Sequence, residues 1–238
     1  ERGSTTVLLG TSGCGKTTLM RMVNAMVTPT SGAVFVRGAN VADEDPVRLR
    51  RSIGYVLQEG GLFPHRSIAD NIATVPRLEG ATKHASRERA LELLTLVGLD
   101  REMADRYPAQ LSGGQRQRVG VARALANRAD ILLMDEPFGA LDPIVRAELQ
   151  RELKEIQRAL GTTILFVTHD VDEAFTLGDQ VAVLSTGGHI EQVGTPTELL
   201  SSPASPFVAE FVGASRAARP VRVAGPGGLV VDDAGTPV

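Results

Sequence analysis

The alternation of strand-like and helix-like segments along these 238 residues predicts an α/β fold built on a parallel sheet. Three observations carry this prediction. An early apolar run passes through a glycine-rich loop into a helical pattern, a later apolar run ends in two carboxylates, and strand and helix signals alternate again over residues 131–184. A chain of this length can bury one substantial core.

The first strand is expected around Val7-Leu8-Leu9, and a helix is expected to follow from Thr18. Between them stands the spacing Gly-x-x-x-x-Gly-Lys-Thr, in which glycines let successive N–H groups turn toward phosphate oxygens at a helix N-terminus. Lys16 would reach the β- and γ-phosphates, and the Thr17 hydroxyl would bind Mg²⁺. The alternative is an ordinary glycine-rich turn, but such a match arises by chance in about one chain in a hundred of this size. The sequence therefore predicts a nucleoside triphosphate site formed by Gly10, Thr11, Ser12, Gly13, Cys14, Gly15, Lys16, Thr17 and Thr18.

A strand-like run follows over 53–57 and ends at Gln58. Residues 62–126 are richer in helical periodicity, most clearly over 87–97, and they predict a helical insert in the α/β core. Near its end lies Leu111-Ser112-Gly113-Gly114-Gln115, where Ser112 can cap a helix and the glycines expose its first N–H groups. Taken alone, this segment would be interpreted as a capped surface helix.

The apolar run 129–134 leads into Asp135-Glu136-Pro137 and is typical of a central parallel strand. Ligands of open α/β sheets bind at the carboxyl ends of strands, so both carboxylates should face the phosphates. Asp135 would hold Mg²⁺ and Glu136 would polarise the attacking water. Without the phosphate loop, the same residues would more simply be a turn.

Strand–helix alternation continues to the end of the core. A helix is expected over Pro143–Leu160, with Pro143 suited to its first turn and Gly161 to its terminus. A strand over Thr163–Thr168 ends at His169, and a helix over 171–177 and a strand over 181–184 follow. A single Gln or His at the end of a strand would ordinarily be structural.

In their order and spacing these motifs resemble those of ATP-binding cassette (ABC) ATPases from Val7 to Gly213. The run Leu111 to Gln115 is similar to the signature motif of that family, and Gln58 resembles the glutamine of its glutamine loop. Gly139-Ala140-Leu141-Asp142 resembles the D-loop, and His169 resembles the switch histidine. The resemblance implies a P-loop NTPase fold with a RecA-like core and a helical subdomain over about 62–126.

The resemblance also implies a mechanism that one chain cannot perform alone. In ABC ATPases two cassettes associate head to tail, and each ATP lies between one subunit's phosphate loop and the other's signature motif. Catalysis is then expected from Glu136, His169 and Gln58, and Mg²⁺ binding from Thr17, Asp135 and Gln58. Contacts to the ATP of a second ATPase subunit are expected from Ser112, Gly113, Gly114, Gln115 and Asp142.

A finer resemblance concerns the transported solute. The segments 45–51, 54–58, 61–65, 70–76, 135–143 and 192–196 are similar to the ATPases of osmoprotectant importers for glycine betaine, choline, carnitine or proline betaine. Such a subunit works with integral membrane permeases at the cytoplasmic face of the cell membrane, and indirectly with an extracytoplasmic substrate-binding protein. The alternative is an importer ATPase for another small polar solute, such as an amino acid, polyamine or sulfonate.

The resemblance divides the chain into an ABC nucleotide-binding domain over 1–213 and a tail over 214–238. The N-terminal antiparallel strands of the family, and the aromatic residue that stacks on adenine, have no counterpart here, so we expect a truncated chain. Residues 229–235 predict a strand running into a turn. This piece is weakly similar to cystathionine-β-synthase-type regulatory domains, although a plain tail is the simpler interpretation.

Composition and the motifs together argue against several other classes of protein. A net charge of −3, no Trp and two Tyr argue against a nucleic-acid partner. The single cysteine, Cys14, excludes an internal disulfide, and no apolar stretch approaches the roughly 20 residues that span a bilayer. Soluble ABC ATPases of translation or DNA repair usually have paired cassettes, a long coiled coil or basic surfaces, and this sequence indicates none of these. A clamp that binds ATP without hydrolysing it would be expected to lack Glu136 or His169.

Overall fold

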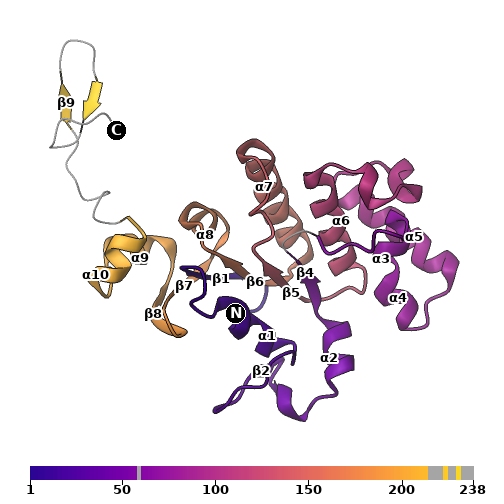
Figure 1. The fold of residues 1–238 in the computed structure, drawn as a ribbon, viewed down its shortest axis with the longest axis horizontal. Helices are drawn as coiled ribbons and strands as arrows, with labels where there is room; N and C mark the ends of the chain where they lie inside the picture. The colour runs from indigo at the N-terminus through magenta and orange to yellow at the C-terminus, as the bar shows by residue number, and fades with distance from the viewer. Residues whose placement is uncertain (58–59, 214–221, 225–228, 232–238) are drawn as a thin grey trace.

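A six-stranded sheet forms the centre of the molecule and confirms the α/β fold class (Figure 1). The computed structural model describes residues 1–57, 60–213, 222–224 and 229–231. The strand order is β4-β5-β6-β1-β7-β8. The six strands are β1 (Thr5–Gly10), β4 (Gly54–Val56), β5 (Ile131–Asp135), β6 (Thr163–Thr168), β7 (Gln180–Ser185) and β8 (His189–Gly194).

The first five strands of this sheet run parallel, and only β8 is antiparallel to its neighbour β7. The register pairs Leu9 with Thr168 and Asp135 with Val167. The carboxyl ends of β1, β5 and β6 therefore meet at one edge of the sheet. This edge is where a parallel α/β sheet places its ligands.

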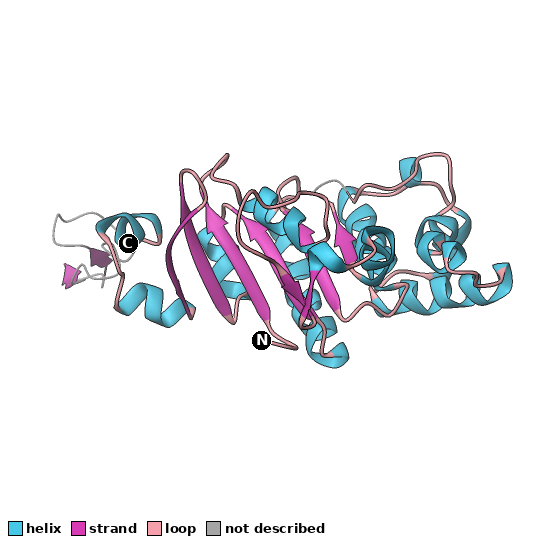
Figure 2. Cartoon of the chain, turned by 90° about the horizontal axis from the view of Figure 1, so that it is seen from below, coloured by secondary structure: helices cyan, strands magenta, loops and turns pink. Residues whose placement is uncertain are grey.

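Both faces of the sheet are buried over its five parallel strands, and alternate apolar residues along these strands belong to two separate apolar clusters. Leu8 and Leu133 pack with Met20 and Leu49, whereas Leu9 lies in the larger cluster on the other face. Figures 1 and 2 show helices on both sides of the strands. Helices that contribute to these clusters include α1 (Lys16–Val23) and α2 (Pro46–Ser52) on one face, and α7 (Pro143–Leu160) and α8 (Val171–Leu177) on the other.

Residues 62–126 contain helices and no strand within the described part of the chain. They lie at one end of the sheet, beside β4 (Figure 1). The division into a separate subdomain stays a prediction. The helices are α3 (Ile68–Ile72), α4 (Thr74–Leu78), α5 (Lys83–Leu96), α6 (Gly113–Leu125) and the 3₁₀ turns η2 (Arg101–Asp105) and η3 (Pro108–Gln110).

The remaining elements are short. A two-stranded hairpin pairs β2 with β3, and a second pairs β9 with β10. The expected strand near 229 is present as β10, while the expected turn after it lies outside the described residues. No helix of the described chain combines the length and the apolar character that a bilayer crossing requires. These elements are β2 (Phe35–Val36), β3 (Ala39–Asn40), η1 (Val41–Asp43), α9 (Pro196–Ser201), α10 (Pro206–Phe211), β9 (Arg222–Ala224) and β10 (Leu229–Val231).

Candidate functional site

The glycine-rich loop turns tightly between β1 and α1, as its sequence predicts. Gly13 and Gly15 adopt left-handed φ angles of 79° and 108°, which residues with a side chain rarely reach. A Cβ atom at Gly10 would lie 2.5 Å from the Leu184 carbonyl oxygen, so the close approach of β7 also requires glycine there. Within the described residues no side chain caps α1. Its first N–H groups are therefore available to an anion.

Lys16 is held inside this loop and is only 4% exposed. Its Nζ donates hydrogen bonds to the carbonyl oxygens of Gly10 and Thr11 at 2.8 and 2.9 Å. The sulfur of Cys14, which is also buried, lies 3.9 Å from the same Nζ. By contrast, Thr11, Ser12 and Gly13 at the tip of the loop are exposed. The loop thus presents backbone donors to solvent with an ammonium group directly beneath them.

Asp135 lies against the start of α1, although 118 residues separate it from Thr17. The Thr17 hydroxyl donates a hydrogen bond of 2.8 Å to Asp135 Oδ1. The Tyr55 hydroxyl approaches Asp135 Oδ2 at 3.5 Å, and burial raises the pKa of Tyr55, so this phenol stays protonated. A hydroxyl and a carboxylate side by side offer the hard oxygen donors that Mg²⁺ prefers.

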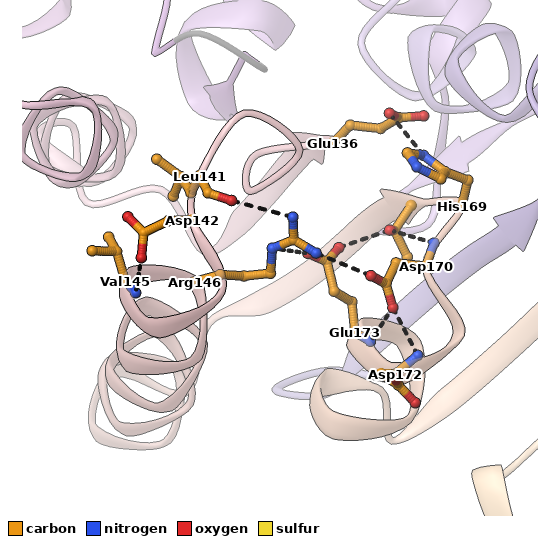
Figure 3. A network of polar contacts seen from close by, with 10 residues as sticks. Glu136, Leu141, Asp142, Val145, Arg146, His169, Asp170, Asp172 and Glu173 are labelled. Carbon is orange, nitrogen blue, oxygen red and sulfur yellow. Dashed lines mark hydrogen bonds and ion pairs between the residues drawn. The ribbon is translucent and has the colours of Figure 1, made fainter.

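Glu136 and His169 meet at the ends of β5 and β6. His169 Nδ1 lies 3.0 Å from Glu136 Oε2 (Figure 3). The Glu136 backbone has a φ of 44°, an uncommon conformation for a residue with a side chain, and its N–H donates to the Val167 carbonyl at 3.0 Å. This bend turns the chain out of the strand and directs the carboxylate to the histidine of the neighbouring strand.

The predicted signature segment begins α6 in the helix-rich part of the chain. Ser112 and Gln115 form a capping box: the Ser112 Oγ accepts from the Gln115 N–H at 3.2 Å, and the Gln115 side chain accepts from the Ser112 N–H at 2.9 Å. Ser112 itself is exposed. Among the described residues, no recorded hydrogen bond joins this segment to the phosphate loop of the same chain.

Gly113 and Gly114 allow α6 to pack closely on the segment that begins α7. A Cβ atom at Gly114 would lie 2.7 Å from Val145 Cγ1, and one at Gly113 would lie 3.4 Å from the side chain of Leu141. Asp142 caps α7 by accepting a hydrogen bond from the Val145 N–H at 3.1 Å. The predicted signature and D-loop residues are thus neighbours, although they remain apart from the phosphate loop.

The predicted glutamine Gln58 lies outside the described residues. Conversely, three polar residues around His169 were not expected from the sequence: Arg146, Asp170 and Glu173. Asp170 caps α8 by accepting from the N–H groups of Asp172 and Glu173 at 2.9 and 3.1 Å. The spacing Asp-x-x-Glu at a helix start is a capping signal that could have identified two of them. Arg146 has no comparable signal.

Comparison with known proteins agrees with this geometry. The ABC transporter family model matches residues 1–139. The chain is 54% identical over 215 residues to the glycine betaine/carnitine/choline transport ATP-binding protein OpuCA of Bacillus subtilis, and 51% identical over 215 residues to the osmoprotectant import ATP-binding protein OsmV of Salmonella typhimurium. Each alignment covers 90% of this chain and 56% of the relative, so the chain spans little more than half the length of these proteins.

Other relatives are named for the import of a different solute. The sulfate/thiosulfate import ATP-binding protein CysA of Brucella melitensis is 51% identical over 227 residues, covering 94% of this chain and 62% of its own.

A similar solved structure is a dimeric post-hydrolysis state of an ATP-binding cassette bound to ADP and Pi, with a TM-score of 0.73 and 33% identity. The match covers 82% of this chain and 87% of that structure. With the fold, the loop geometry and the family match in agreement, this chain belongs to the ABC transporter ATP-binding family.

Proposed function

We propose that this chain hydrolyses ATP at a site shared between two copies and thereby drives an importer for a quaternary-amine osmoprotectant. The observation that carries the ATPase part is the convergence of three strand ends on the phosphate loop. β1 supplies the loop, β5 supplies Asp135 and Glu136, and β6 supplies His169. Each group stands at the edge of the sheet where the phosphates of ATP would lie.

The chemistry follows from the contacts of these side chains. The Lys16 ammonium and the free N–H groups at the start of α1 bind the phosphate oxygens. Thr17 and Asp135 would hold Mg²⁺, which when bound would neutralise charge on the phosphates. Glu136 accepts a proton from the attacking water. His169, 3.0 Å from Glu136 Oε2, fixes the orientation of that carboxylate, and at this end of the sheet it would contact the γ-phosphate of bound ATP.

A second copy completes the site. The exposed tip of the phosphate loop and the exposed Ser112 lie on separate parts of the chain, and each precedes a helix N-terminus that could face one polyanion from opposite sides. The related cassette bound to ADP and Pi is dimeric. ATP would hold the two copies together, and hydrolysis would release them.

Contact with permease subunits is assigned to a pocket of about 250 Å³ between the core and the helix-rich segment. Phe63, which follows Gln58 by five positions in the sequence, lines this pocket, and cationic and aromatic side chains stand among its lining residues. The lining includes Arg50, Arg51, Tyr55, Phe63 and Arg123. Through these partners the ATPase would sit at the cytoplasmic face of the membrane.

The solute is inferred from the named relatives, because this chain contacts ATP and not the transported molecule. OpuCA and OsmV carry names of quaternary-amine or osmoprotectant systems, whereas CysA carries that of a sulfate system. The segments that resemble osmoprotectant importers in sequence favour the first group. Sulfate or thiosulfate import is the second candidate.

An uptake experiment separates these candidates. The gene is deleted in a host that lacks other quaternary-amine importers, and uptake of labelled glycine betaine, choline and sulfate is measured at low and high osmolarity. We expect uptake of glycine betaine or choline to fall by at least about tenfold, most at high osmolarity, with sulfate uptake unchanged. A plasmid carrying the wild-type gene should restore uptake, and Glu136→Gln should not, because an amide keeps the shape but cannot act as a base. Loss of sulfate uptake alone would reverse the choice of solute, and near-normal turnover by purified Glu136→Gln would contradict the role of Glu136.

A further inference from the structure

Arg146, in the first turn of α7, connects two loops that carry predicted site residues. Its Nη2 donates to the Leu141 carbonyl oxygen at 3.3 Å, directly before Asp142. Its Nη1 donates to Asp170 Oδ2 at 3.1 Å, directly after His169. Figure 3 shows the guanidinium group lying between these two loops.

The loop that holds His169 is itself closely bonded. The Asp170 N–H donates to Thr168 Oγ1 at 3.0 Å, and that hydroxyl donates to Glu173 Oε2 at 2.7 Å. The backbone of His169 is therefore fixed on both sides, by Thr168 and by Asp170. A displacement of Asp170 or Glu173 would therefore be passed to the residues on either side of His169.

Arg146 also faces the carboxylate of Glu173. Its Nε lies 3.7 Å from Glu173 Oε1, too far for a hydrogen bond, and within the described residues this buried Nε has no hydrogen-bond partner. Glu173 is 4% exposed. A buried donor that has no partner and faces a buried carboxylate would gain from a small approach of α7 toward α8.

We infer that Arg146 is a positioning residue that couples the loop 139–142 to His169. When a second copy engages Asp142, the shift of this loop is transmitted through the Leu141 carbonyl and the Arg146 guanidinium to Asp170 and Glu173. His169 then changes its position relative to Glu136. This inference rests on the proposed hydrolysis of ATP between two copies.

The test compares Arg146→Met with Arg146→Lys in the intact protein. Arg87→Met is the matched control, because it also removes an arginine–carboxylate ion pair, with Asp105, but far from the site. We expect Arg146→Met to lower kcat roughly ten- to hundredfold while KM and the Kd for ATP change less than about twofold, since misplacement of a reacting group affects the chemical step. Arg146→Lys keeps the charge toward Asp170 and should recover part of the rate. Arg87→Met should leave kcat unchanged.

A second measurement is independent of turnover. With ring-labelled histidine, the NMR signals of the four histidines can be followed in each variant. Arg146→Met and Arg146→Lys should move the His169 signal and leave His65 and His189 in place, whereas Arg87→Met should leave His169 unchanged. If Arg146→Met does not fold, both the kcat and the NMR signal of His169 are measured on Arg146→Lys.

The two hypotheses fail in different ways. Absence of ATP turnover by the wild type would overturn the proposed function. A wild type that hydrolyses ATP, together with Arg146 variants of normal kcat or with an unmoved His169 signal, would overturn the coupling through Arg146. Equal losses of kcat in Arg146→Met and Arg87→Met would also overturn it, because the effect would then be one of general stability.

Discussion

At the scale of single residues, the site depends on groups held in unfavourable states. Glu136 adopts a left-handed φ of 44°, and Lys16 buries an ammonium group against two carbonyl oxygens. Strained or buried groups of this kind persist only where the surrounding structure fixes them, and they concentrate at functional sites. Here β6 fixes Glu136 through the Val167 carbonyl, and the loop itself fixes Lys16.

Glu173 gives a residue-scale prediction about pH. Burial raises the pKa of its carboxyl above the ordinary 4.5, and the Thr168 hydroxyl and Arg146 only partly offset this. The native state then binds the proton more tightly than the unfolded state. The stabilisation is complete below the unfolded-state pKa and is lost as pH rises through the raised native-state pKa.

Glu173→Gln removes this titration and keeps an oxygen that can accept from the Thr168 hydroxyl. We expect the free energy of unfolding of the wild type to fall relative to that of the variant as pH rises above 4.5. The fall should approach about 1.4 kcal/mol per pH unit while the native carboxyl is protonated and the unfolded one is ionised. Urea denaturation of both proteins at several pH values, from about 4.5 to about 8, measures the difference. A difference that stays constant over this range would contradict the raised pKa.

At the scale of elements, the sequence predicted the helices and strands whose ends carry a characteristic capping or terminating residue. The helix Pro143–Leu160 has the expected boundaries, with Pro143 in its first turn and Gly161 at a φ of 62° after its end. The strand Thr163–Thr168 also agrees with the prediction. Ser112 caps α6, as expected from the sequence.

Elements whose stability comes from tertiary neighbours were not anticipated. Strand β8 has exposed Ile190 and Val193 and forms because it pairs antiparallel with β7. The short helices α9 and α10 follow it, and neither is long enough to show a repeated pattern of apolar residues at helical spacing. For the site, the motifs predicted which residues gather at the sheet edge, but not Arg146, whose partners lie in loops distant in sequence.

The contact between α6 and α7 gives a prediction at this scale. Gly114→Ala would bring Cβ to 2.7 Å from Val145 Cγ1, and a β-branched side chain has little freedom to move away. We expect the variant to lose about 1–3 kcal/mol of unfolding free energy, as other overpacked cores do. Gly113→Ala is the matched control, because its Cβ would meet Leu141 at an ordinary 3.4 Å. Denaturant unfolding compares the two, and equal stabilities would show that the helices do not pack as described.

At the scale of the whole molecule, the groups that we propose to bind the phosphates of ATP lie in two separate places of the described chain. Backbone donors of α1 and the Lys16 ammonium lie at the sheet edge, whereas the N-terminus of α6 lies in the helix-rich segment. If one chain used the phosphate loop and the N-terminus of α6 on the same ATP, these two groups would have to lie next to each other. The separation is what a shared site between two copies requires, and it makes the two groups separable by mutation.

Lys16→Ala should weaken ATP binding by each monomer at least about tenfold, because a charge-assisted contact of about 1.5–3 kcal/mol is lost. Ser112→Arg should leave ATP binding by the monomer within about twofold, yet prevent ATP-dependent dimerisation by placing a large side chain where the partner's nucleotide would lie. Ser112→Ala is the control, since it removes the same cap, at a cost of about 1 kcal/mol, without adding bulk. Calorimetry on dilute monomer and sedimentation with ATP in the Glu136→Gln background measure the two effects. If Ser112→Arg weakened ATP binding by a strictly monomeric sample as much as Lys16→Ala does, α6 would act on the nucleotide of its own chain and the shared site would be wrong.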